Sequence, residues 1–103
     1  MATSVIKNNV KMPDYSVVLA TINTVGAMWT ATENCCIAGR MSCTLSGAAI
    51  LYVNGIEVCR GYPGGSSSGA ITYPVFIMVK KGDTVSTRNI NDNSYTLTAY
   101  ALR

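Results

Sequence analysis

The sequence predicts an all-β fold, a single-domain antiparallel β-sandwich or jelly roll, and three observations support that prediction. The β-branched residues are numerous, with 10 Val, 8 Ile and 11 Thr against 5 Leu, 2 Glu and no Gln, a balance that favours strands over helices. Turn residues separate short apolar segments at intervals of about 8–12 residues, as in sandwiches and jelly rolls. The length of 103 residues allows one domain.

Eight strands are predicted within a domain that spans residues 12–103, and the polar residues 1–11 form a lead-in or linker. The predicted strands are Ser16–Ile22, Ala27–Ala31, Cys35–Cys43, Ala48–Val53, Ile56–Arg60, Ile71–Val79, Thr84–Arg88 and Tyr95–Leu102.

Flanking residues set the boundaries of the first three strands. Pro13 fixes φ and has no amide hydrogen, so the turn Met12–Ser16 precedes the first strand. The turns Asn23–Gly26 and Thr32–Asn34 precede the second and third strands. Gly39, inside the third strand, indicates a bulge or the close approach of another backbone.

The fourth and fifth strands form a hairpin, because Asn54-Gly55 between apolar segments predicts a type I′ turn. A two-residue loop pairs Val53 with Ile56, Tyr52 with Glu57, Leu51 with Val58, and Ile50 with Cys59. One face is then the core face, with Leu51, Val53, Ile56 and Val58. The other face, with Ile50, Tyr52, Glu57 and Cys59, is too apolar for simple exposure to solvent, so we expect it to be covered.

The last three strands follow the Gly- and Ser-rich loop Tyr62–Ala70. Pro74 indicates that the sixth strand lies at an edge or contains a bulge. Lys80–Asp83 predicts a hairpin turn in which Gly82 takes a positive φ. The polar loop Asn89–Ser94 precedes the closing strand, on which neither face is polar enough to be simply exposed.

Composition excludes several classes of chemistry. The chain has no His, which excludes Ser/His/Asp and Cys/His catalysis and imidazole metal ligands. Its five carboxylates are scattered, and the net charge of +3 shows no basic cluster that would read nucleic acid. The sequence therefore predicts neither an enzyme nor a nucleic-acid partner, and no cofactor.

The cysteines predict buried thiols and no metal site. Adjacent strand residues Cys35 and Cys36 point to opposite faces, and CxxC pairs are missing. Cys43 and Cys59 could form a disulfide, but Met1–Ser4 does not begin a signal peptide, so free thiols are expected. Apolar stretches of about six residues predict no membrane insertion.

Several motifs resemble the small C-terminal domains of bacteriophage tail fibres. They are Met12-Pro13-Asp14-Tyr15-Ser16, Met28-Trp29-Thr30-Ala31-Thr32-Glu33-Asn34, Leu51-Tyr52-Val53-Asn54-Gly55, Val79-Lys80-Lys81-Gly82-Asp83-Thr84-Val85 and Leu97-Thr98-Ala99-Tyr100-Ala101-Leu102. The resemblance covers residues 12–103 and implies a C1q/TNF-like jelly roll that assembles as a threefold knob. Cys35-Cys36 departs from the pattern of that group, and so does the loop Gly64–Gly69.

The resemblance implies a non-catalytic receptor-binding domain at the tip of a tail fibre in the virion, made in the bacterial host cytoplasm. Its partners would be two further copies of itself and a glycan or protein of the host surface. One alternative is a purely structural trimerisation or capping module of a fibre. Another is a secreted C1q/TNF-like ligand.

Candidate binding and interface residues follow from the loops and the doubly apolar strands. The loop Arg60–Gly69 combines an arginine and a tyrosine with small polar residues, a composition suited to a sugar. The predicted ligand-binding residues are Arg60, Tyr62, Ser66, Ser67 and Ser68, and the predicted trimer interface contains Ile50, Tyr52, Tyr100 and Leu102. Trp29 is expected to fill the core or a subunit contact.

Overall fold

A computed structural model describes residues 11–44, 47–63 and 71–103, and these residues form two antiparallel sheets in one domain. All eight predicted strands are confirmed, with boundaries that differ by up to three residues. The strands are β1 (Pro13–Ile22), β2 (Met28–Thr30), β3 (Cys35–Cys43), β4 (Ala49–Val53), β5 (Ile56–Gly61), β6 (Ile71–Val79), β7 (Thr84–Thr87) and β8 (Asn93–Leu102).

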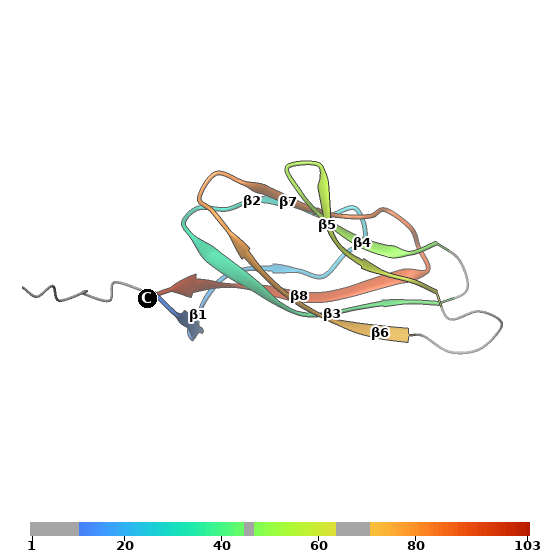
Figure 1. The fold of residues 1–103 in the computed structure, drawn as a ribbon, viewed down its shortest axis with the longest axis horizontal. Helices are drawn as coiled ribbons and strands as arrows, with labels where there is room; N and C mark the ends of the chain where they lie inside the picture. The colour runs from blue at the N-terminus through green and yellow to red at the C-terminus, as the bar shows by residue number, and fades with distance from the viewer. Residues whose placement is uncertain (1–10, 45–46, 64–70) are drawn as a thin grey trace, which may run out of the picture.

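The two sheets pack face to face as the layers of a sandwich (Figure 1). One sheet has the strand order β1-β8-β3-β6 and the other has the order β2-β7-β4-β5. Every strand pair is antiparallel. The chain ends close to where β1 begins, since the backbones of Met12 and Arg103 exchange two hydrogen bonds of 3.1 and 2.9 Å.

Alternate residues of each strand supply the core between the sheets, as the period of a strand requires. Strand β8 shows this most simply, because Tyr95, Leu97, Ala99 and Ala101 are buried and the residues between them face outward. Trp29 packs against this core, as expected for a structural tryptophan. The fully buried members with the largest side chains are Ile22, Ile37, Met41, Leu51, Leu97 and Val85.

The predicted hairpin is present, but its register changes after two residue pairs. Asn54 and Gly55 have φ values of 53° and 78°, which confirms a turn with two positive φ angles. Val53 pairs with Ile56 and Tyr52 with Glu57, as predicted, whereas Leu51 pairs with Cys59 and Ile50 with Arg60.

The register shift leaves Val58 as an extra residue on β5 and reverses the predicted faces of that strand from Cys59 onward, whereas Leu51 and Val53 keep their predicted place on the core side. Ile56 and Val58 are exposed, so their predicted place in the core is wrong. The tip of this hairpin projects from the sandwich, where no second sheet covers it (Figure 1). Beyond the bulge, Cys59 packs against the core and Arg60 turns outward.

Two further turns and one close approach bear on the sequence predictions. Gly82 has a φ of 92° in the turn Lys80–Asp83, as predicted. Gly39 marks a close approach rather than a bulge, because the pairing of β3 is unbroken and a Cβ there would lie 2.0 Å from the Thr96 carbonyl oxygen. The predicted loop Asn89–Ser94 is too long, since its last two residues belong to β8.

Candidate functional site

Ile50 lies between two arginines on the outer face of the sheet β2-β7-β4-β5. Its neighbours Ala49 and Leu51 point into the core, so Ile50 points outward. Arg60 pairs with it on one side, and the backbone N–H of Arg88 donates to its carbonyl at 3.0 Å on the other. Ile50 is nevertheless only 3% exposed, which fits long arginine stems lying along an apolar surface.

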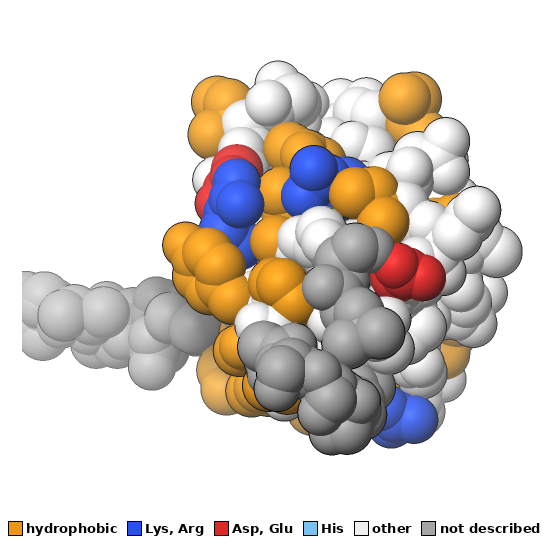
Figure 2. Space-filling model, turned by 90° about the vertical axis from the view of Figure 1, so that its right-hand side faces the viewer, with side chains coloured by type: hydrophobic (Ala, Val, Ile, Leu, Met, Phe, Trp, Pro, Cys, Tyr) orange, Lys and Arg blue, Asp and Glu red, His pale blue; other side chains and the backbone are white. Residues whose placement is uncertain are grey.

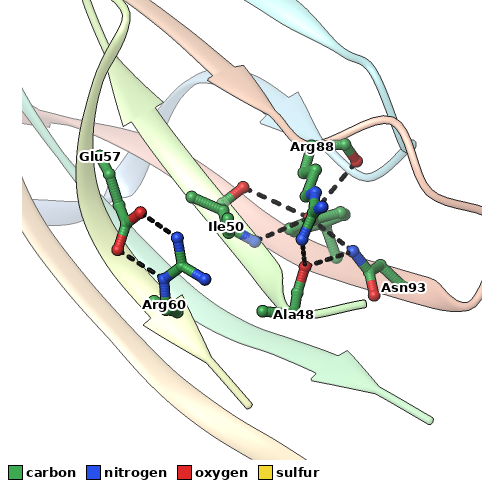
Figure 3. Close-up of polar contacts among 7 residues, drawn as sticks. Ala48, Ile50, Glu57, Arg60, Arg88 and Asn93 are labelled. Carbon is green, nitrogen blue, oxygen red and sulfur yellow. Dashed lines mark hydrogen bonds and ion pairs between the residues drawn. The ribbon is translucent and has the colours of Figure 1, made fainter. Parts of the chain in front are cut away.

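Arg60 is held by a carboxylate on its own strand. Its Nε donates to Glu57 Oε2 at 2.7 Å, and its Nη2 donates to Glu57 Oε1 at 2.5 Å. This two-point hydrogen bond from Arg60 lowers the pKa of Glu57 below its ordinary value. The charge of Arg60 is therefore matched by Glu57 within the same strand (Figure 3).

Tyr62 is an exposed aromatic side chain on a firmly held backbone. The guanidinium carbon of Arg60 lies 5.7 Å from the centre of its ring, within cation–π distance. The Tyr73 hydroxyl donates to the Tyr62 carbonyl at 3.0 Å. The Tyr73 ring also lies against Gly61, where a Cβ would come within 2.4 Å of it. The Tyr62 side chain itself remains 61% exposed.

Arg88 differs from Arg60 because no carboxylate of the described residues forms an ion pair with it. Its Nη1 donates to the Ala48 carbonyl at 3.1 Å, and its side chain is half-buried. Glu57 is close enough for the charge of Arg88 to contribute to lowering the pKa of that carboxyl, although less than Arg60 does.

The buried side chains of Asn93 and Tyr95 hold the segment that contains Ala48 and Ile50 (Figure 3). Asn93 Nδ2 donates to the Ala48 carbonyl at 3.0 Å, so this oxygen accepts from both Asn93 and Arg88. The Tyr95 hydroxyl accepts from the Ile50 N–H at 3.2 Å. These bonds connect β8 in one sheet to β4 and the residue before it in the other sheet, and they support the carbonyl that Arg88 binds.

We call Glu57, Arg60, Tyr62 and Arg88 around Ile50 the arginine patch. Figure 2 looks onto one end of the sandwich and shows basic side chains, some beside acidic ones, set among apolar side chains. The structure thus brings the predicted residues Arg60 and Tyr62 together. The predicted residues Ser66, Ser67 and Ser68 lie outside the described residues.

Sequence reasoning missed Arg88 as a member of this patch. Arg88 follows the short strand β7, and no motif surrounds it. Only the pairing of β7 with β4, which are more than 30 residues apart in the chain, places it beside Ile50.

The four residues predicted for a trimer interface do not share one face. Tyr100 and Leu102 point outward from the sheet β1-β8-β3-β6, since their neighbours Ala99 and Ala101 are buried. Ile50 and Tyr52 lie on the outer face of the opposite sheet. One flat contact surface of a protomer therefore cannot contain all four residues.

A second surface, on the outer side of the sheet β1-β8-β3-β6, is apolar. Val18 pairs with Tyr100, Tyr100 with Cys36, and Cys36 with Met78, so one row crosses all four strands. Cys36 in this row is fully buried although it faces outward. Tyr15 packs edge-on against Tyr100, with ring centres 4.9 Å apart.

Large side chains on this surface are open to solvent. Val18 and Phe76 are each 55% exposed, and Met78 is 57% exposed. We call Tyr15, Val18, Phe76, Met78 and Tyr100 the apolar face. Contiguous apolar surface of this kind usually marks a site of interaction with another molecule.

The described residues contain no group of His, Cys, Asp or Glu that could hold a metal ion, and no pocket occurs among them. All four cysteines are thiols, with Cys35, Cys36 and Cys43 buried and Cys59 half-buried. Within 11–44, 47–63 and 71–103 there is no helix long and apolar enough to cross a membrane.

Comparison with known proteins identifies no relative. No protein-family model matches the chain, and neither a curated protein nor a solved structure does.

Proposed function

We propose that this chain is a non-catalytic domain at the distal end of a bacteriophage tail fibre or a similar virion appendage. In this proposal it assembles as a homotrimer and recognises a receptor on the host cell surface. The observation that carries the proposal is the apolar face, whose large exposed side chains need a partner surface. The fibre role rests on the sequence motifs that resemble tail-fibre domains.

The strand pairing supports a jelly roll of the C1q/TNF type. A jelly roll is a long hairpin of eight strands wrapped into two sheets, which places the first strand beside the last and the fourth beside the fifth. The pairs β1–β8, β2–β7, β3–β6 and β4–β5 are all present here. The turn motifs of the resemblance coincide with turns of the chain at Asn54-Gly55 and Lys80–Asp83.

The apolar face suits a symmetric assembly better than attachment to a soluble ligand. It extends from the edge strand β1 to the edge strand β6, and four of its five side chains are more than half exposed. A closed cyclic arrangement would cover this surface equally in each copy. On this face, the trimer interface that we propose contains Tyr100 and Leu102, whereas Ile50 and Tyr52 lie on the opposite sheet.

Solution mass tests the assembly. Size-exclusion chromatography coupled to light scattering should give a molecular mass of about three times the chain mass of 10.9 kDa. Met78→Glu should convert the trimer to monomers, because it places a charge in the apolar contact. Met28→Glu is the matched control, since Met28 is 74% exposed on the outer face of the opposite sheet and should leave the trimer intact. A wild-type monomer would refute the assembly.

Cell binding tests the receptor role separately. The labelled trimer should bind host bacteria in a pull-down, and excess unlabelled protein should displace it. A stable trimer that binds no cell of a broad host panel would contradict the receptor role and favour the structural module instead.

A further inference from the structure

We propose that the arginine patch binds the anionic group of an acidic sugar, with Arg88 as the residue that selects for the negative charge. This inference rests on the proposed receptor role and names the class of receptor. It goes beyond the sequence-based expectation of a sugar at Arg60 and Tyr62, because it names an anionic group on that sugar and assigns the group to Arg88, with Arg60 in a supporting role.

The division of roles follows from the existing partners of the two arginines. Arg60 already makes a two-point hydrogen bond with Glu57, so an incoming anion would have to compete with that carboxylate. Arg88 uses one N–H for the Ala48 carbonyl, and a guanidinium has five. The remaining donors of Arg88 have no hydrogen-bond partner among the described residues.

The net charge of the arginine patch favours a ligand with one negatively charged group. Arg60 and Arg88 contribute two positive charges and Glu57 one negative charge, which leaves a net charge of +1. A single positive charge does not make the stripe that nucleic acid requires. It suits a ligand with one carboxylate, and the planar fork of an arginine binds a carboxylate through two parallel hydrogen bonds.

The surroundings of Arg88 suit the rest of a sugar ring. Arg60 on β5, Ile50 on β4 and Arg88 directly after β7 form one row across the sheet. The Cα atoms of the two arginines are therefore about 10 Å apart, a span comparable with one or two sugar rings. Tyr62, 61% exposed, offers aromatic surface at the Arg60 end of the row. Glu57 can accept hydrogen bonds from sugar hydroxyls.

The patch is also fixed before any ligand arrives, which lowers the entropic cost of binding. The bonds from Asn93 and Tyr95 hold the segment Ala48–Ile50 that supports Arg88. Gly61 and Tyr73 hold the backbone of Tyr62. Both ends of the row are thereby anchored to the core of the sandwich.

The test compares ligands that differ in one group. Methyl β-glucuronide and methyl β-glucoside share a ring and differ in a carboxylate against a hydroxymethyl group, and inorganic phosphate supplies an anion without a ring. Binding to the full chain is followed by titration in nuclear magnetic resonance spectra. The glucuronide should bind at least tenfold more tightly than the glucoside and more tightly than phosphate, and added salt should weaken it.

Variants assign the effect to Arg88. Arg88→Met should reduce glucuronide affinity at least tenfold, to the level of the glucoside, and Arg88→Lys should lose part of the preference, because it keeps the charge without the planar fork. Arg40→Met is the matched control, since Arg40 is an exposed arginine on the opposite sheet and should change nothing. If Arg88→Met unfolds, Arg88→Lys and Tyr62→Ala provide the test.

Three results would overturn the inference. These are equal binding of the two glycosides, phosphate binding as tight as glucuronide binding, and an unchanged preference in the Arg88 variants. A trimer that binds cells but not the glucuronide would refute the acidic-sugar assignment alone. Glucuronide binding by a protein that is monomeric in solution would refute the trimer and leave the patch in place.

Discussion

The side-chain amide of Asn54 donates a hydrogen bond to the carboxylate of Asp83, with Nδ2 and Oδ1 3.0 Å apart. Its amide oxygen accepts from the backbone N–H of Thr84 at 2.9 Å, and its own backbone N–H donates to the Thr84 carbonyl at 2.7 Å. The turn between β4 and β5 is therefore tied to the turn that precedes β7, although about 30 residues separate them.

Replacing Asn54 should separate two contributions of this residue. Asn54→Gly keeps a residue that tolerates a φ of 53° but removes both side-chain hydrogen bonds, so it should lower the free energy of unfolding by about 1 kcal/mol. Asn54→Ala also introduces backbone strain and should cost about 2 kcal/mol. Urea denaturation measures both. Asn91→Ala, in the exposed loop before β8, is the control that should change little.

Acid should weaken the hydrogen bond between Asn54 and Asp83. The hydrogen bond from Asn54 is the largest cause that lowers the pKa of Asp83 below its ordinary value of 3.8. The resulting stabilisation is present above that ordinary pKa and is lost as the pH falls through the lower pKa of the folded state. Urea denaturation at pH 7 and pH 2.5 should show that the free energy of unfolding falls less for Asn54→Gly than for the wild type between these two pH values. Identical losses would contradict this role of Asn54.

Gly39→Ala should be far more damaging than Gly55→Ala. Both glycines have a positive φ, 148° at Gly39 and 78° at Gly55. A Cβ at Gly39 would lie 2.0 Å from the Thr96 carbonyl oxygen, whereas a Cβ at Gly55 would meet nothing within 4 Å. We expect a loss of about 1 kcal/mol for Gly55→Ala and more than about 3 kcal/mol for Gly39→Ala. Thermal unfolding checks the order of stability of the two variants, and equal losses of stability would refute the close approach at Gly39.

The eight strands were predictable because their signals are local. Asn54-Gly55 fixes one turn and Gly82 another, and the alternation along Tyr95–Leu102 identifies its inward face without reference to any other strand. The sheet orders could not be derived in this way. They depend on which distant strands meet, such as β3 with β8, and no residue of either strand encodes the partner.

The candidate site was predictable only in part. Arg60 and Tyr62 are neighbours in sequence, so a loop containing both was visible. The outward direction of Arg60 depends on the bulge at Val58, which the regular alternation of β5 conceals. Without that bulge, Cys59 would lie beside Ile50 and Arg60 would point inward, and the arginine patch would not exist.

Alkaline pH should destabilise the fold through Cys35. Burial is the main cause that raises the pKa of this thiol from 9.0 to about 11, with the neighbouring Cys36 next in importance. The raised pKa stabilises the folded state below pH 9, and this contribution is lost as the pH rises toward 11. The difference in the free energy of unfolding amounts to at most about 3 kcal/mol.

A variant isolates that contribution. Cys35→Ala should lose less stability than the wild type between pH 8.5 and pH 11, as measured by urea denaturation in the presence of reductant. Cys59→Ala is the comparison, because Cys59 is half-buried and its pKa is raised by burial alone. An identical pH dependence for the wild type and Cys35→Ala would show that the thiol does not titrate as the structure implies.

Each edge strand of the two sheets is irregular, interrupted or short, so none presents a long regular row of backbone hydrogen-bonding groups. β1 has two register shifts, β5 has one, β6 contains Pro74, and β2 is three residues long. An added strand needs a continuous row of free amide and carbonyl groups, and a proline has no amide hydrogen to donate. At high local concentration, copies of this domain would therefore resist joining edge to edge into open-ended β-ribbons. Closed oligomers would then have to form through the faces of the sandwich.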